Sequence, residues 1–140
     1  MHNVHLTSEF AAYANTTVQG KRDLRLQFIH ADHVVIPEAS LPADWIVLGS
    51  SRHCAVQGVL QPGRVMTFQG HFEFDRFIST ETVKIFGALW DERVREDALR
   101  AIDEEDDSEV AATIVAEFLA GGWKTTGLLT PPEELRSDTM

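Results

Sequence analysis

Basic residues are scarce in this sequence, and their scarcity argues against one large class of functions. The 140 residues include 12 lysines and arginines against 22 aspartates and glutamates, which gives a formal net charge of -10. Proteins that grip nucleic acid by its phosphates need a clustered basic surface. We therefore expect no nucleic-acid partner.

Cysteine and long apolar runs are also scarce. Cys54 is the only cysteine, so it can form no internal disulfide, and we interpret it as a small buried residue. No apolar run approaches the roughly 20 residues that span a bilayer, and the N-terminus lacks a secretory-signal pattern. The sequence also has no glycine-rich phosphate loop. We expect a cytoplasmic protein without membrane contact, cofactor or metal.

What the chain does have is enough apolar sequence for one core. With 44% hydrophobic residues, 140 residues suffice for one domain and are too few for two ordinary ones. We assign residues 1–122 to that domain. Residues 123–140 combine two prolines with mixed charges and are predicted to form a partly disordered C-terminal tail.

The apolar pattern changes from strand-like to helical along the chain. Strands are expected at residues 3–6, 24–29, 45–48, 54–60 and 65–68, the last as a buried central strand, with an early helix at 9–14 capped by Thr7 or Ser8. Later apolar residues recur at helical spacing in three sets: Ile78, Thr82, Ile85, Phe86 and Leu89; Val94, Ala98, Ala101 and Ile102; Val110, Ile114, Val115 and Phe118. We expect the first two helices to lie on the sheet, and Asp107 or Ser108 to cap the third.

Two polar clusters follow predicted strands. His71 and Glu73 lie two residues apart, so in extended backbone both point to one side, where the carboxylate can orient the imidazole. His30, Asp32 and His33 follow the strand at 24–29, at a position where loops on a sheet often carry function. A surface hydrogen bond and a solvated loop are the structural alternatives.

Three segments together resemble a known family. They are LQFIHADHV at 26–34, VLGSSRHCAVQ at 47–57 and TFQGHFEF at 67–74. In this order they resemble the C-terminal half of class I glutamine amidotransferases, most closely the free-standing GMP-synthase-like branch. The resemblance covers about residues 3–120. It implies an α/β fold, a truncated flavodoxin-like sandwich whose mixed sheet is flanked by helices.

The resemblance also implies roles for individual residues. In this family a Cys-His-Glu triad hydrolyses glutamine; His71 matches the histidine that takes the nucleophile's proton, and Glu73 matches the acid that orients it. The loop with His30, Asp32 and His33 matches one that flanks the substrate pocket. Phe72 stands where the family usually has proline, and we expect it to form an aromatic wall beside His71.

The chain departs from the family at the nucleophile. No Gly-x-Cys-x-Gly motif occurs, and Cys54 matches a cysteine that is not the nucleophile in this branch. The chain begins where the family's second half begins, so the resemblance implies that the nucleophile elbow is absent. Ordinary glutaminase activity is not expected from this chain alone.

Three functions remain open. The first is a repurposed enzyme that uses His71 and Glu73 for acid–base catalysis (cyclisation, isomerisation, elimination or hydrolysis) on a small metabolite, in a setting such as natural-product biosynthesis. The second is a glutaminase half that needs a partner chain or a missing region. The third is a non-catalytic scaffold. A chain that corresponds to half of the family's fold would expose a sheet edge. Self-association would cover that edge, so we also expect a homodimer.

Overall fold

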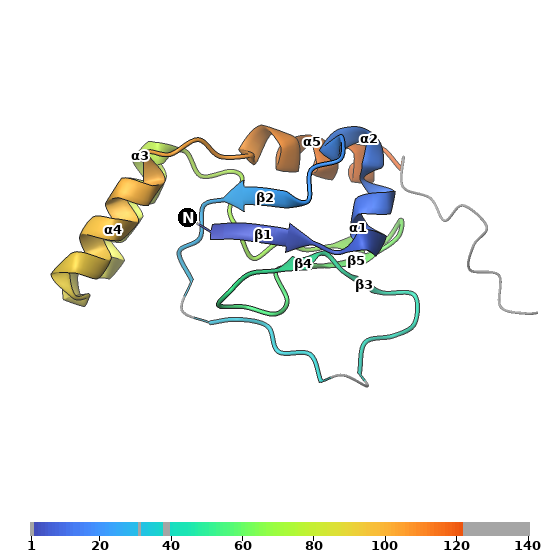
Figure 1. Cartoon of the computed structure of the whole chain (residues 1–140), viewed down its shortest axis with the longest axis horizontal. Coiled ribbons are helices and arrows are strands. Elements are labelled where there is room, and N and C mark those ends of the chain that lie inside the picture. The colour runs from blue at the N-terminus through green and yellow to red at the C-terminus, as the bar shows by residue number, and fades with distance from the viewer. Residues whose placement is uncertain (1, 31, 38–39, 122–140) are drawn as a thin grey trace, which may run out of the picture.

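Most of the strands come in the first half of this chain, and the longer helices follow them (Figure 1). The computed structural model describes residues 2–30, 32–37 and 40–121, so the predicted tail at 123–140 lies outside the described residues. The elements in chain order are β1 (His2–Leu6), α1 (Ser8–Tyr13), α2 (Asn15–Val18), β2 (Asp23–Leu26), β3 (Ile46–Val47), β4 (Gly49–Ser50), β5 (Val59–Gln61), β6 (Val65–Met66), α3 (Arg76–Phe86), the 3₁₀-helix η1 (Gly87–Leu89), α4 (Glu92–Ile102) and α5 (Ser108–Leu119).

The strands form two small sheets rather than the single mixed sheet that was expected. Their orders are β2-β1-β4 and β3-β5-β6, and every pairing between these described strands is antiparallel. The chain changes sheets at Leu48, whose N–H donates to Gly58 O (2.8 Å) while its carbonyl accepts from Thr7 N (3.0 Å). At the next residue the backbone of β1 comes so close that a Cβ on Gly49 would lie 2.4 Å from His5 O. Only glycine fits there.

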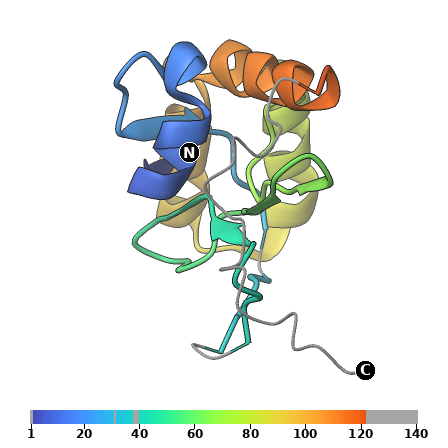
Figure 2. The same ribbon diagram turned by 90° about the vertical axis from the view of Figure 1, so that its right-hand side faces the viewer.

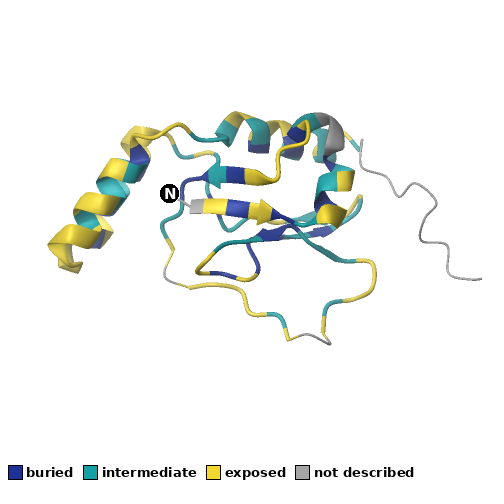
Figure 3. Cartoon of the chain, in the orientation of Figure 1, coloured by how far each residue is buried: buried dark blue, intermediate teal, exposed yellow. Residues whose placement is uncertain are grey.

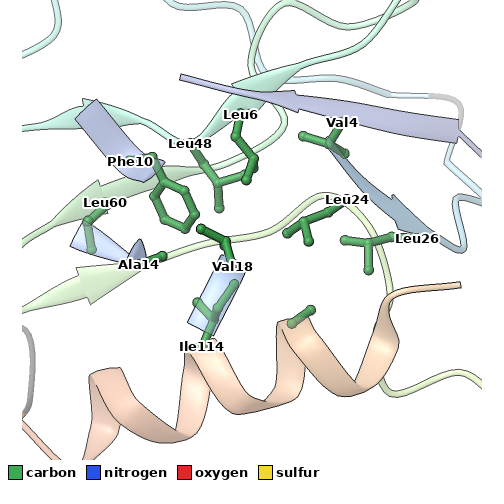
Figure 4. Close-up of a cluster of buried hydrophobic side chains, with 11 residues drawn as sticks. Val4, Leu6, Phe10, Ala14, Val18, Leu24, Leu26, Leu48, Leu60 and Ile114 are labelled. Atoms are coloured by element: carbon green, nitrogen blue, oxygen red, sulfur yellow. The ribbon is translucent and has the colours of Figure 1, made fainter. Parts of the chain in front are cut away.

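The hydrophobic core lies between the strands and the helices α1, α2 and α5 (Figure 4). It is built from eleven buried residues: Val4, Leu6, Phe10, Ala14, Val18, Leu24, Leu26, Leu48, Leu60, Ala111 and Ile114. Figures 1 and 2 show α5 beside α2, where Thr17 Oγ1 donates to Glu117 Oε2 over 2.5 Å. The predicted apolar face of the third helix therefore does face the core.

The predicted early helix is confirmed, with its cap. Thr7 Oγ1 accepts from Phe10 N (3.2 Å) and donates to Val47 O (2.6 Å), so one hydroxyl satisfies a free amide of α1 and ties the helix to β3. Between this helix and the next strand, the chain forms the additional short helix α2, for which no element was predicted.

The expected central strand at 65–68 is wrong in both length and place. Only Val65 and Met66 form β6, which lies at the edge of the second sheet, and both residues are half-buried. At the next residue one backbone bond is replaced by a side-chain bond: Thr67 N donates to Val59 O (2.9 Å), but Val59 N donates to Thr67 Oγ1 (2.9 Å). Further on, Gln69 N donates to Gln57 O (2.9 Å).

The α3–α4 hairpin contradicts the expectation that both helices lie on the sheet. The helices form where their apolar spacing predicted them, but they pack on each other and extend away from the strands (Figure 1). The buried residues of α3 are Ser79 and Val83, whereas Ile85 and Leu89 of the predicted stripe are exposed. Helical periodicity predicts an apolar face but cannot say what covers it.

The acidic turn before α5 attaches this helix to β2. Arg25 N donates to Asp107 Oδ2 (2.9 Å), Asp107 N donates to Arg25 O (2.8 Å), and Lys21 forms an ion pair with the Asp107 carboxylate. The helix begins at Ser108, as expected, but the carboxylate that accepts from the Ser108 amide (3.0 Å) is that of Asp106.

Asp106 has a lowered pKa. Partial burial raises the pKa of its carboxyl, but hydrogen bonds from the hydroxyl and amide of Ser108 and from the Gln27 side chain oppose this effect. The charge of Arg76 adds to them, so the pKa lies below its ordinary value of 3.8. The folded state thus binds this proton more weakly than the unfolded chain, so Asp106 stabilises the fold above about pH 4 and loses that effect as the pH falls further.

We expect Asp106→Ala to lower the free energy of unfolding by about 1–2 kcal/mol at neutral pH, because amides that start α5 lose their acceptor. Denaturant titrations at several pH values should show that the difference in free energy of unfolding between the variant and the wild type becomes smaller below about pH 4. The exposed neighbour Glu105 supplies the control, Glu105→Ala, which should change little. An Asp106→Ala gap that stays constant with pH would contradict the assignment.

Candidate functional site

His71 is held by its backbone at the end of β2. Its N–H donates to Gln27 O (2.8 Å), and the two residues form an isolated antiparallel bridge that extends the strand. Gly70 permits this approach, because a Cβ there would lie 2.7 Å from Phe28 Cζ and 3.0 Å from Leu26 Cβ. Contact with β2 therefore fixes the position of the histidine before its side chain makes any bond.

The predicted His71–Glu73 pair is formed. Nδ1 of His71 lies 2.7 Å from Oε1 of Glu73. An ionised carboxylate can only accept, so Nδ1 carries the hydrogen and Nε2 keeps the lone pair. The His71 ring also stacks on the Phe74 ring, with centroids 4.0 Å apart and planes 10° from parallel. The ring is thus restrained by a carboxylate at one edge and an aromatic face below.

Glu73 has a lowered pKa even though half of its side chain is exposed. Partial burial raises the pKa of its carboxyl, but the hydrogen bond from the His71 ring, backbone hydrogen bonds at Glu73 and Phe72 and the charge of protonated His71 outweigh that effect. Glu73 is therefore an anion at neutral pH, as the orienting role requires.

An open groove of about 930 Å³ passes in front of His71. One wall comes from the end of β2 and the 71–74 segment, and the other from the α3–α4 hairpin. The lining residues are Phe28, Ile29, His30, His71, Phe74, Thr82, Phe86, Trp90, Val94, Asp97, Ala98 and Ala101. Most are apolar or aromatic, which is typical of small-molecule sites, and the few polar groups include two imidazoles.

The predicted loop cluster reaches the groove through one residue. His30 lines the groove, and its Nδ1 lies 2.5 Å from the carbonyl oxygen of Asp32, which can only accept, so Nδ1 is again the protonated nitrogen. Asp32 and His33 are exposed and do not line the groove. The structure thus brings His30 and His71 together and leaves the other two side chains outside.

Phe72 lies on the core side of the motif. Its ring packs edge-on against Phe68, with centroids 5.9 Å apart, and contacts the hydrophobic core rather than the groove. The aromatic wall beside His71 is instead Phe74.

Phe72 was expected beside His71 because it stands where the related family usually has proline. The extended backbone that puts His71 and Glu73 on one side puts the residue between them on the other, which here is the core side. The chain then turns at Asp75, whose carboxylate accepts from Ile78 N (2.8 Å) at the start of α3.

Sequence reasoning missed the hairpin side of the groove. Phe86, Val94, Ala98 and Ala101 were recognised as apolar stripes, but were expected to face the sheet. Trp90 and Asp97 were not considered. The available signal was the spacing of residues 94, 97, 98 and 101, which places Asp97 on the same helical face as the apolar residues.

Gln27 connects both walls of the groove. Its buried side-chain amide donates to Ile102 O at the end of α4 (3.5 Å) and to Asp106 Oδ2 (3.4 Å), while its backbone carbonyl holds His71. The hairpin and the catalytic candidate are thus attached to the same residue.

Cys54 is buried, and its Sγ lies 3.2 Å from the Val56 carbonyl. The expectation of a small buried residue is confirmed. Within the described ranges, no group of three or more His, Cys, Asp or Glu side chains could hold a metal ion. In the same part of the chain, no helix is long and apolar enough to cross a membrane.

Comparison with known proteins finds a distant relative of this chain. A glutamine amidotransferase-like protein of Schizosaccharomyces pombe is 28% identical over 102 residues, which are 71% of this chain and 40% of that relative. This chain is its distant homologue. The match supports the glutamine amidotransferase-like family, with which the mixed helix-and-strand architecture is compatible. No family model and no solved structure matches the chain.

The tautomer of His71 can be tested directly. Above neutral pH, long-range ¹⁵N–¹H spectra of the histidine rings should show His71 protonated at Nδ1. In Glu73→Gln the amide can either donate or accept, so we expect a mixture of tautomers. The control is the His53 ring, which lies outside the groove and should show the same tautomer in the wild type and the variant. An Nε2–H tautomer in the wild type would contradict the hydrogen bond.

Proposed function

We propose that this chain is an acid–base catalyst that acts on a small organic molecule bound in the groove. The observation that supports the proposal best is the His71–Glu73 pair at 2.7 Å, with His71 lining a groove whose other walls are mostly aliphatic and aromatic side chains. His71 and Glu73 are the proposed catalytic residues. His30 is the proposed substrate-binding residue, and Asp32, His33 and Phe72 would act from outside the groove by shaping the loop and the motif.

The proposed chemistry follows from the tautomer. Nε2 of His71 takes a proton from the substrate, while Glu73 stabilises the imidazolium that forms. The same Nε2–H then returns the proton at another substrate atom. His30 offers a second imidazole in the same groove and could bind the group on which charge develops. This sequence suits isomerisation, cyclisation, elimination or hydrolysis.

The groove lining favours one class of substrate. None of the described residues that line it is a lysine or arginine, so a carboxylate such as that of free glutamine would find no permanently charged partner there. Aromatic rings and small apolar side chains instead suit an uncharged, largely apolar or aromatic molecule. Such a substrate is consistent with a role in natural-product biosynthesis.

The comparison favours a second candidate, a glutaminase half. The matched region is 40% of the relative, and the sequence has no Gly-x-Cys-x-Gly motif. In this alternative the chain corresponds to the C-terminal half of a glutaminase, and another chain supplies the nucleophile. It predicts ammonia release from glutamine only after that chain is added. Ammonia from the isolated chain would contradict both candidates.

The decisive test compares small molecules in cells that carry the intact protein with cells that carry His71→Ala at the same protein level. We expect one compound to accumulate and a later one to fall about 100-fold or more, since a positioned general base contributes about 10²–10⁴ in rate. The mass difference between the two compounds identifies the reaction class.

Two further variants make this comparison interpretable. Glu73→Gln should reproduce the change in weaker form, because it leaves the imidazole in place but removes the charge that orients it. His53→Ala, which changes a histidine outside the groove, should leave the profile intact. If His71→Ala also leaves it intact, the catalytic proposal fails and the non-catalytic scaffold hypothesis is favoured.

A further inference from the structure

The outer face of α3 is apolar and uncovered. Phe77, Ile78, Ile85 and Phe86 are exposed to 72%, 40%, 68% and 71%, and Leu89 just beyond the helix to 99%. In Figure 3 the hairpin is mostly exposed, whereas the strands combine buried and exposed residues. Isolated exposed apolar residues are ordinary, but several on one side of a short helix mark an interaction surface, here with Glu81 and Thr82 between the two isoleucines.

This face is self-complementary. The sequence of α3 reads the same in both directions at its ends, with Phe77-Ile78 near the start and Ile85-Phe86 at the finish. The midpoint of this palindrome lies between Glu81 and Thr82. When two such helices lie antiparallel about a two-fold axis at that midpoint, each Ile78 faces Ile85 of the other copy, as an isologous interface requires.

The other residues of the helix fit the same arrangement. At each end of the pair, Phe77 of one copy and Phe86 of the other lie at the same level on opposite flanks of the isoleucines. Glu81 lies beside the two-fold axis, so the two Glu81 carboxylates come close together, and Lys84 on the same flank of each copy comes within reach to offset their repulsion. Glu81 and Lys84 already form an ion pair within one chain at 2.7 Å, and the dimer would extend it.

Charge also favours a second copy as the occupant. The chain has a formal net charge of -10, so most faces of two copies repel each other. Residues 76–102, which form the hairpin, contain five basic and five acidic side chains and carry no formal net charge. Contact through the hairpin therefore brings no net charge together, whereas contact through residues 103–121, which contain seven acidic and no basic side chains, would bring like charges together.

We infer that the chain forms a homodimer in which α3 packs antiparallel against α3 of a second copy. The interface buries the isoleucine pairs at its centre and the phenylalanines at its flanks. It uses the hairpin rather than a sheet edge, which was the surface that the sequence suggested. Phe86 belongs to both the interface and the groove, so dimerisation also fixes one rim of the groove.

The first test is mass in solution, by light scattering over a range of concentrations. The wild type should have twice the 15.7 kDa mass of one chain. Ile85→Glu places a carboxylate against Ile78 twice per dimer and should raise the dimer dissociation constant roughly 100-fold. Leu119→Glu, an exposed leucine on α5, should leave the mass unchanged. A monomeric wild type, or a dimer insensitive to Ile85→Glu, would overturn the inference.

A second test locates the two-fold axis. In Glu81→Cys the two thiols of a dimer lie next to each other across the axis. Mild oxidation should therefore link most of this variant into a covalent dimer, while the control variant remains unlinked over the same time. The control is Lys84→Cys, whose copies point away from the axis on the same exposed helix. Native Cys54 is buried and does not compete. Equal linkage of both variants would contradict this register.

Discussion

The arrangement of the candidate site depends on one buried residue, Gln27. Its backbone carbonyl receives the His71 amide, and its side-chain amide reaches the last carbonyl of α4 and the Asp106 carboxylate. A buried amide must satisfy its donors, so these partners are drawn to a common point. The two walls of the groove are thereby positioned relative to each other, although they are far apart in the sequence. The site is a product of this junction as much as of its lining residues.

Local features were predictable from the sequence because they depend on neighbouring residues. The Thr7 cap, the three later helices and the His71–Glu73 pair follow from spacing of four residues or fewer. What could not be predicted depends on contacts between distant segments. The groove needs the α3–α4 hairpin to stand away from the strands, and the apolar stripe of α3 alone fits equally a sheet-facing helix. The expected place of Phe72 rested on the proline of the related family, but its ring packs against the core and Phe74 lies beside His71.

The proposed catalyst and the proposed dimer place different demands on the same hairpin. The inner side of α4 offers small residues, Ala98 and Ala101, which leave room for a ligand. The outer side of α3 offers large side chains, which fill an interface. A short helical hairpin can thus separate binding of a small molecule from self-association, with Phe86 as the residue common to both.

The change of sheets at Leu48 has a consequence for cooperativity. Since one residue bonds with its N–H to one sheet and with its carbonyl to the other, neither sheet can lose its edge without breaking the pairing of its neighbour. The two small sheets are each too slight to persist alone. They should therefore open together, as one unit in amide hydrogen exchange. The strands that precede His30 and His71 should then exchange their amide hydrogens at the same opening rate.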